Sequence, residues 1–201
     1  MKISPLFRTA LELVGAFLAL TLLALTLGHY YVELWLPLYR LAAGWLLPEY
    51  RVVELVLRQG ANEMVLALSA ETARNMVIGL KFLPAGIGMT SSTLAGHVLQ
   101  HPVIIFSLLL AWPTVPWRGR WRLVLCGIPL LVVVALLDVP FVLAGALQDL
   151  VLGSIAPDQA SSSILIGWMH FLNGGGRLVL SIMAALLAVS GHSLLLRQLR
   201  T

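Results

Sequence analysis

The chain has 201 residues, of which 59% are hydrophobic and only 11% charged, and its mean hydropathy is +0.93. Side chains with so little polar surface cannot cover a soluble globule of this size, which excludes a water-soluble domain and predicts a polytopic membrane protein in contact with the lipid bilayer. The net charge of +4 does not indicate nucleic-acid binding, because the basic residues form short clusters beside apolar segments, as orientation signals do.

The first apolar segment runs from about Thr9 to Gly28. Its length of roughly 20 residues matches a bilayer core. We expect an anchor helix and not a cleaved secretory signal, because the apolar run is long for a signal and no small-residue cleavage site follows it. The aromatic-rich stretch "YYVELWLPLYRLAAGWLLPEY" follows and predicts an interfacial helix, broken near Pro37 and Pro48.

A small β-region is expected next. In "RVVELVLRQGANEMVLALSAE", alternating side chains flank the turn residues "QGAN", which predicts two short strands joined by a hairpin. The segment "NMVIGLKFL" is expected to add a third strand and complete a meander before the loop "PAGIG".

Three more apolar segments complete the chain: about Leu94 to Trp112, the stretch after Arg122, and about Arg177 to Leu196. The predicted fold class is therefore mainly α, a polytopic membrane protein of about four transmembrane helices with a small extracytoplasmic β-containing region between the first and second. The predicted parts are an anchor helix (1–28), an extracytoplasmic region with the interfacial helix and β-meander (29–92), and a three-helix membrane bundle (93–201).

Basic residues predict the orientation. They stand at alternate ends of the four segments, which by the positive-inside bias places both termini in the cytoplasm and the chain in the inner (plasma) membrane; these residues are Lys2, Arg8, Arg118, Arg120, Arg122, Arg197 and Arg200.

Counting depth at about 1.5 Å per residue places several polar residues in one layer near the outer leaflet. These are Ser91, Ser92, His97, His101, Asp138, His170, Asn173 and Arg177. A charge at the centre of a membrane helix costs about 2.5–3.5 kcal/mol on insertion scales, so Asp138 is expected to have a partner. We predict that Asp138 forms a structural pair between the third and fourth helices, with Arg177 as its first candidate partner and a histidine as the alternative, while a functional role of the layer stays open.

Six residues of this layer are the candidate catalytic residues, namely Ser92, His97, His101, Asp138, His170 and Arg177. His97 and His101 are spaced i, i+4, which suits two metal ligands, but "HVLQH" lacks the glutamate of an HExxH motif, so no metal or other cofactor is expected. A serine at 91 or 92 with His97 as base is chemically conceivable, yet no GxSxG elbow surrounds it. The single cysteine, Cys126, lies toward the inner face and is expected to be a small buried apolar residue.

The order of features from Trp35 to Leu152 resembles the exosortase/archaeosortase membrane proteins. It comprises an outer pre-helix, short apolar strands, a small-residue motif that opens an apolar segment, the turn "WPTVPWRGRWR", and a further segment with a polar residue near its outer end. In that family a cysteine is the proposed nucleophile, helped by an arginine and a histidine, in cutting and transferring the C-terminal sorting tails of surface proteins.

This chain departs from the family pattern at the catalytic positions. "SSTLAGH" stands where the cysteine is expected, and "LDVPF", with Asp138, stands where the asparagine and arginine are expected. The resemblance therefore implies a catalytically silent relative or an exosortase-associated membrane protein.

The sequence thus favours a non-enzymatic accessory or partner subunit that binds another membrane protein and is linked to the processing or export of surface proteins. The alternative is a membrane-embedded, exosortase-like transpeptidase or hydrolase that uses the outer polar layer.

Overall fold

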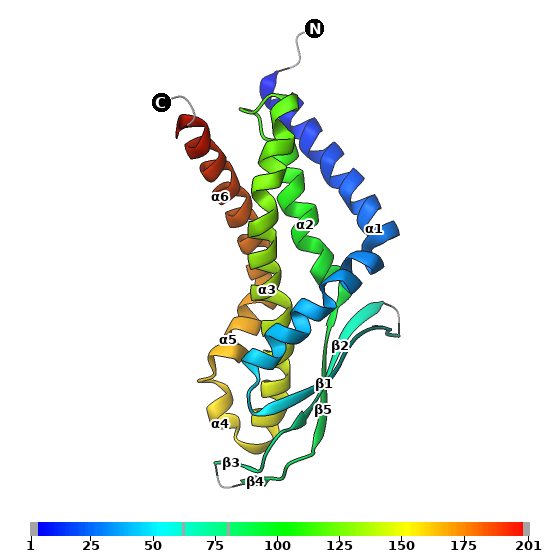
Figure 1. The fold of residues 1–201 in the computed structure, drawn as a ribbon, viewed down its shortest axis with the longest axis vertical. Coiled ribbons are helices and arrows are strands. Elements are labelled where there is room, and N and C mark those ends of the chain that lie inside the picture. Colours follow the sequence, from blue (N-terminus) through cyan, green and yellow to red (C-terminus); the bar gives the residue numbers. More distant parts are fainter. Residues whose placement is uncertain (1–3, 62, 80, 199–201) are drawn as a thin grey trace. The chain divides into compact units, whose positions relative to one another are not determined.

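A computed structural model describes residues 4–198 of the chain except Asn62 and Leu80 (Figure 1). Lys2 and Arg200 of the predicted orientation signals, and Asn62 of the predicted turn, lie outside the described residues. The chain divides into two compact units, each described by itself below. Unit 1 comprises Met1–Gly28, Leu99–Ala135 and Arg177–Thr201, and unit 2 comprises His29–Val98 and Leu136–Gly176.

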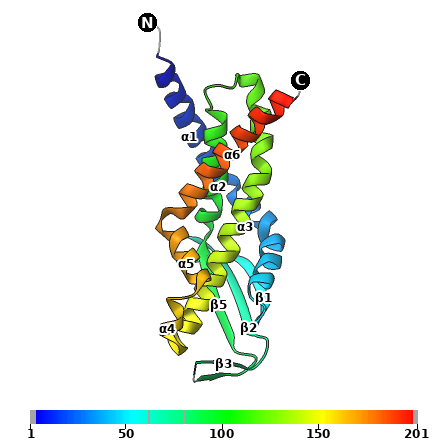
Figure 2. The same cartoon turned by 90° about the vertical axis from the view of Figure 1, so that its left-hand side faces the viewer.

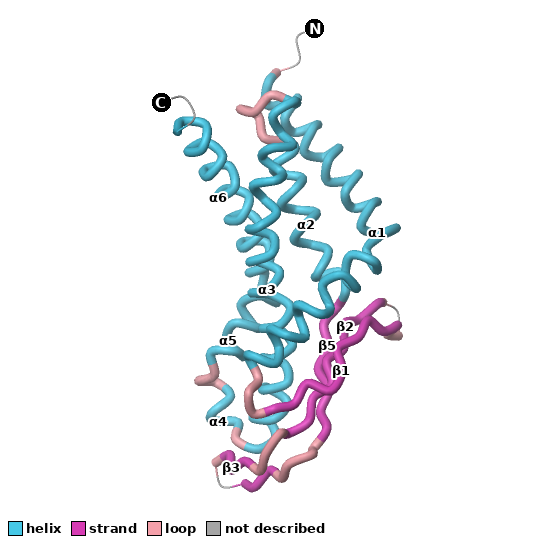
Figure 3. The backbone as a smooth tube through the Cα atoms, in the orientation of Figure 1, coloured by secondary structure: helices cyan, strands magenta, loops and turns pink. Residues whose placement is uncertain are grey.

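Helices make up most of the structure, as predicted (Figure 3). They are α1 (Pro5–Leu46), α2 (Ala95–Leu110), α3 (Trp117–Ile155), α4 (Pro157–Ala160), α5 (Ile164–Phe171), the π-helical turn η1 (Leu172–Gly176) and α6 (Arg177–Gln198). Within the described part of the chain, three helical stretches are long and apolar enough to cross a membrane: Pro5–Leu46, Trp117–Ile155 and Ile164–Leu194. The second predicted membrane segment corresponds to α2, an apolar helix of only 16 residues.

The predicted break near Pro37 is wrong, because α1 continues through this residue as one helix of 42 residues. A proline inside a helix removes one backbone hydrogen bond and costs about 3 kcal/mol. Packing on both sides of it opposes that cost, since Val32, Tyr39 and Ala43 are all buried. The predicted break near Pro48 is correct: α1 ends at Leu46, because the residue before a proline disfavours helical dihedral angles.

Unit 1 has its core between α2, the first half of α3 and α6. The buried side chains of this core are Ile105, Leu109, Leu123, Leu131, Val134, Ala184, Ala185 and Ala188, and Cys126 packs against them partly buried. The first part of α1 is linked to α3 in this unit by an ion pair, in which Arg120 Nη2 lies 2.7 Å from Glu12 Oε2. The most apolar 18-residue window of α1 nevertheless has none of its residues buried.

Unit 2 is built around an antiparallel sheet with strand order β1-β2-β5. The strands β1 (Tyr50–Gln59) and β2 (Met64–Thr72) form the hairpin that the sequence predicts, with Gln59 opposite Met64 and the Gly60 N–H donating to Glu63 O at 2.8 Å. The central strand β2 is the most buried of the three.

The predicted meander is wrong in its third strand. The segment "NMVIGLKFL" forms β3 (Met76–Ile78) and β4 (Lys81–Leu83), which pair only with each other and lie beyond the end of the main sheet (Figures 1 and 2). Gly79, at φ +60°, starts the tight turn that folds this segment onto itself. The third strand of the sheet is instead β5 (Gly88–Leu94), which leads directly into α2.

A β-bulge interrupts the edge strand β1. The pairing of β1 with β2 shifts between Val52 and Glu54, so that Val53 has no partner in the ladder. The freed carbonyl of Val53 accepts a hydrogen bond of 3.1 Å from Arg40 Nη2 on α1. The backbone carbonyl that the bulge leaves without a strand partner is therefore hydrogen-bonded by a side chain from outside the sheet.

The second half of α3 packs closely on α5 within unit 2. A Cβ atom on Gly145 of α3 would lie 2.7 Å from Leu165 O and 2.8 Å from Met169 Cβ, so only glycine allows this approach. Trp168 of α5 donates from Nε1 to the carbonyl of Leu137 at 2.8 Å.

Candidate functional site

The serines of the predicted polar layer lie on β5, where they point to opposite sides of the sheet. Ser91 is buried, and its Oγ donates to Leu143 O of α3 at 2.9 Å. Ser92 is exposed and lies opposite Ala67 of β2. Ser91 thus links β5 to α3 by a hydrogen bond, whereas the candidate Ser92 lies on the solvent-exposed face of the strand.

His97 lies in the first turn of α2 and is half-buried. Its Nδ1 is 3.4 Å from Oγ1 of Thr93, the buried hydroxyl residue four positions earlier. This long contact ties the start of the helix to the end of β5.

His101 is 1% exposed and lies on α2 in unit 1. Its Nδ1 is 2.8 Å from Oγ of Ser181, a fully buried residue of α6. Ser181 Oγ also lies 2.8 Å from the carbonyl oxygen of Arg177. The Ser181 hydroxyl has one proton for these two neighbours, so it donates either to the Arg177 carbonyl or to His101 Nδ1, and the tautomer of His101 decides which.

Sequence reasoning missed Ser181. The available signal was its spacing of four residues from Arg177, which puts the two on one face of a helix. What the sequence did not reveal is that His101, 80 positions away, lies opposite that face.

Asp138 is completely buried on α3, and Arg177 is 4% exposed at the start of α6. Both have polar or electrostatic interactions with other residues, and Asp138 acts electrostatically on Tyr39 of unit 2. Their mutual pairing stays a prediction. His170 and Asn173, in contrast, are exposed, at the end of α5 and in η1.

Among the described residues, no group of three or more His, Cys, Asp or Glu side chains is placed to hold a metal ion. His101 Nδ1 is also engaged with Ser181. The structure therefore offers no described ligand set with which His97 and His101 would form a metal centre.

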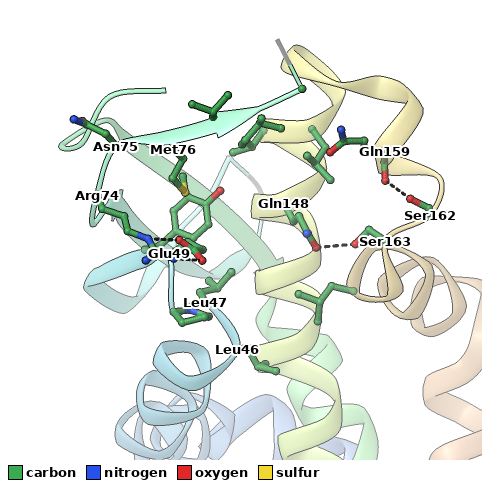
Figure 4. Close-up of a pocket in the computed structure, with 18 residues that line it drawn as sticks. Leu46, Leu47, Glu49, Arg74, Asn75, Met76, Gln148, Gln159, Ser162 and Ser163 are labelled. Carbon is green, nitrogen blue, oxygen red and sulfur yellow. Dashed lines mark hydrogen bonds and ion pairs between the residues drawn. The ribbon is translucent and has the colours of Figure 1, made fainter. Parts of the chain in front are cut away.

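Unit 2 contains a pocket of about 950 Å³ (Figure 4). It lies between the segment joining α1 to β1, the segment around β3, the end of α3 and the start of α5. Both polar and apolar side chains line it, and its polar lining comprises Glu49, Tyr50, Arg74, Asn75, Gln148, Gln159, Ser162 and Ser163.

One wall of the pocket is a two-pronged ion pair. Arg74 donates from Nε to Glu49 Oε2 at 2.7 Å and from Nη2 to Glu49 Oε1 at 2.5 Å. The hydrogen bonds from Arg74 lower the pKa of the Glu49 carboxyl below its ordinary value, and Glu49 raises the pKa of Arg74. Burial, together with the charge of Glu49, raises the pKa of the Tyr50 phenol. The wall therefore carries a paired carboxylate and guanidinium, both exposed to solvent, beside a phenol.

The opposite wall presents amide and hydroxyl groups (Figure 4). Ser163 Oγ donates to Gln148 Oε1 at 2.7 Å and accepts from the Ile166 N–H at the start of α5. Because the oxygen of Gln148 is the acceptor, its NH₂ group is directed elsewhere. Ser162 donates to the backbone carbonyl of Gln159, a bond that does not use the Gln159 carboxamide.

Neither wall pairs a nucleophile with a base, since the hydroxyls face an amide or a carbonyl and the carboxylate faces a guanidinium. The pocket presents hydrogen-bond donors and acceptors between apolar patches, which suits binding. The Asn75 side chain has a structural role at the pocket, because its Oδ1 accepts a hydrogen bond of 2.8 Å from the Ala85 N–H.

No family model, curated protein or solved structure matches the chain.

Proposed function

We propose that this chain is an integral membrane subunit that binds an extended peptide segment of a partner protein in the pocket of unit 2. It serves as an accessory subunit in the processing or export of surface proteins, in the inner membrane and with both termini in the cytoplasm. The observation that carries this proposal is the lining of the pocket, with its two-pronged ion pair on one wall and its carboxamides and hydroxyls on the other.

The membrane part is supported by α1. Large apolar side chains of this helix are exposed, among them Leu18 at 56%, Leu22 at 64% and Leu25 at 77%. A continuous apolar surface of this kind is not stable in water, whereas in lipid it is the expected surface of a membrane helix.

A peptide fits the pocket by its chemistry. An extended backbone exposes one N–H and one C=O per residue, which Gln148 and Gln159 match, because a carboxamide both donates and accepts. Apolar residues of the lining, such as Met76, Val151 and Leu165, provide surfaces for apolar side chains. The resemblance to exosortase-type proteins adds the expectation that this peptide belongs to a surface protein or to its processing enzyme.

Photo-crosslinking in membranes tests the binding role. A benzoyl-phenylalanine replaces Met76, which lines the pocket, and in a matched control replaces the exposed Val53, which does not. The expected result is one dominant crosslinked partner from position 76, reduced strongly by Arg74→Gln. Arg51→Gln is the control for that change, because Arg51 forms an equally exposed ion pair with Glu71 outside the pocket.

Two results would contradict the binding role. One is equal crosslinking from positions 76 and 53, and the other is a crosslinking yield that is the same in Arg74→Gln as in Arg51→Gln.

Orientation is tested separately, with single cysteines introduced into a Cys126→Ser chain. An impermeant maleimide is expected to label Glu63→Cys in intact cells and Thr114→Cys only after permeabilisation. Labelling of Thr114→Cys in intact cells would contradict the orientation.

A membrane-embedded hydrolase or transpeptidase is the second candidate, favoured by the buried contact of 2.8 Å between His101 Nδ1 and Ser181 Oγ. A serine nucleophile needs a base that takes its proton, and the Arg177 carbonyl, 2.8 Å from Ser181 Oγ, competes with His101 for that proton. A fluorophosphonate probe distinguishes the two roles. Labelling lost in Ser181→Ala and kept in Ser107→Ala would establish the enzyme, and absence of labelling supports the accessory role.

A further inference from the structure

Unit 1 contains a second pocket, of about 690 Å³, at the start of α3. It is lined by Leu110, Trp117, Arg118, Arg120, Trp121, Val124 and Leu125. The polar part comes from two arginines and the rest from aromatic and aliphatic side chains. A ligand for this pocket therefore needs a negative charge at one end and an apolar body.

The two arginines differ in their partners. Arg120 is 7% exposed and is neutralised, since its Nη2 is 2.7 Å from Glu12 Oε2 and its Nε donates to Val115 O at 3.2 Å. Arg118 is exposed and forms no hydrogen bond or ion pair with another residue of the described chain. Arg122, close by in sequence, lies over the ring of Trp121 at 5.4 Å. The pocket thus keeps an uncompensated positive charge.

The tryptophans point to a particular kind of ligand. Trp117 is 74% exposed and Trp121 57% exposed, which is unusual for such large apolar side chains in a water-soluble surface. Exposed tryptophan beside arginine is typical of the headgroup level of a bilayer, where the ring lies between acyl chains and polar headgroups. Leu125, 52% exposed one helical turn further along α3, continues the apolar surface away from the arginine.

We propose that this pocket binds an anionic phospholipid, with the headgroup phosphate on Arg118 and one acyl chain along Leu110, Val124 and Leu125. A guanidinium group can bind a phosphate through two parallel hydrogen bonds. The positive charge around it attracts anionic headgroups of any kind. The proposal rests on the membrane insertion proposed above. It is independent of the peptide-binding role of unit 2.

Native mass spectrometry of the full-length protein, released from micelles containing equal amounts of phosphatidylglycerol and phosphatidylcholine, tests this site. The wild-type chain is expected to retain one phosphatidylglycerol in preference to phosphatidylcholine. Arg118→Gln is expected to weaken phosphatidylglycerol binding about fivefold, the effect of one arginine near an anionic headgroup. Arg118→Lys is expected to keep most of the preference, and Arg58→Gln, which removes a charge from β1, is expected to keep all of it.

Three results would overturn the lipid site: equal retention of the two lipids by the wild-type chain, unchanged preference in Arg118→Gln, or displacement of phosphatidylglycerol by millimolar inorganic phosphate. Extraction of cell membranes with alkaline carbonate separates this failure from failure of membrane insertion. A chain that stays in the membrane pellet but does not prefer phosphatidylglycerol refutes only the lipid site.

Discussion

Arg74 holds both carboxylate oxygens of Glu49, although the two residues are 25 positions apart. Glu49 directly precedes β1, and Arg74 follows the end of β2, so the antiparallel pairing of Tyr50 with Thr72 brings them together. The Ala73 N–H also donates to Glu49 O at 2.9 Å. The ion pair thus closes the open end of the hairpin and at the same time forms a wall of the pocket.

This ion pair predicts a pH-dependent effect of Glu49→Gln. The pKa of Glu49 is lowered in the folded chain by Arg74, so its stabilisation is complete above the ordinary value of 4.5 and is lost as the pH falls through the lower, folded-state value. The melting temperature of the wild type is expected to exceed that of Glu49→Gln slightly at neutral pH, because the pair is exposed to solvent. Thermal unfolding in detergent at decreasing pH is expected to bring the two curves together below pH 4.5. In an Arg74→Gln chain, the same substitution is expected to give no pH-dependent difference, and a difference that persisted there would refute the assignment.

Gly145→Ala is expected to destabilise the packing of α3 on α5. The new Cβ would meet the Leu165 carbonyl at 2.7 Å and Met169 Cβ at 2.8 Å, and overpacking of this kind typically costs about 1–3 kcal/mol. The control is Gly153→Ala on the same helix, because nothing lies within 4 Å of a Cβ at that position. There the better helix propensity of alanine is expected to stabilise the protein by up to about 1 kcal/mol. The free energy of unfolding of the two variants is expected to change with opposite sign, and a similar change in both would contradict the close helix approach.

Ser181→Ala is expected to cost about 1–3 kcal/mol, since it removes the buried hydrogen bond between Ser181 Oγ and His101 Nδ1. Ser107→Ala is the matched control: Ser107 is equally buried, but its Oγ bonds only to the Val103 carbonyl of its own helix, so a smaller loss is expected. A double-mutant cycle with His101→Phe measures the coupling. If the two substitutions were strictly additive, His101 and Ser181 would not depend on each other for stability.

Asp138→Ala and Arg177→Ala test the predicted structural pair. If the two residues form the predicted pair, each single change lowers the free energy of unfolding by about 3–5 kcal/mol, because it removes one partner of a buried pair. The double variant is expected to be no less stable than either single variant. Full additivity in the cycle would show that these two residues are not partners.

The hairpin of β1 and β2 was predictable because its apolar positions alternate and "QGAN" supplies the turn. The strand β5 was not predictable in this way. Its buried positions are Ser91 and Thr93, so burial alternates along the strand while hydrophobicity does not. Its strand conformation follows from pairing with β2, a partner distant in the sequence.

The site was less predictable than the helices. Apolar composition over many residues indicates a long helix locally, which is why the three long apolar helices were expected. The pocket, in contrast, joins side chains such as Glu49, Arg74 and Gln148 from segments that no local pattern connects. Two of the polar residues that the sequence singled out, Ser91 and His101, are held in buried hydrogen bonds outside this pocket.

The bulge at Val53 affects how readily another strand could pair with the edge of the sheet. A strand of ten residues at the edge of a sheet offers a row of unpaired backbone groups on which another strand can add, the first step of aggregation. At Val53 the ladder is out of register and the carbonyl is occupied by Arg40, and the strand carries Arg51, Glu54 and Arg58. An incoming strand would have to break the Arg40 hydrogen bond and bury charge at the same place. The bulge thereby disfavours pairing of another strand with this edge of the folded sheet.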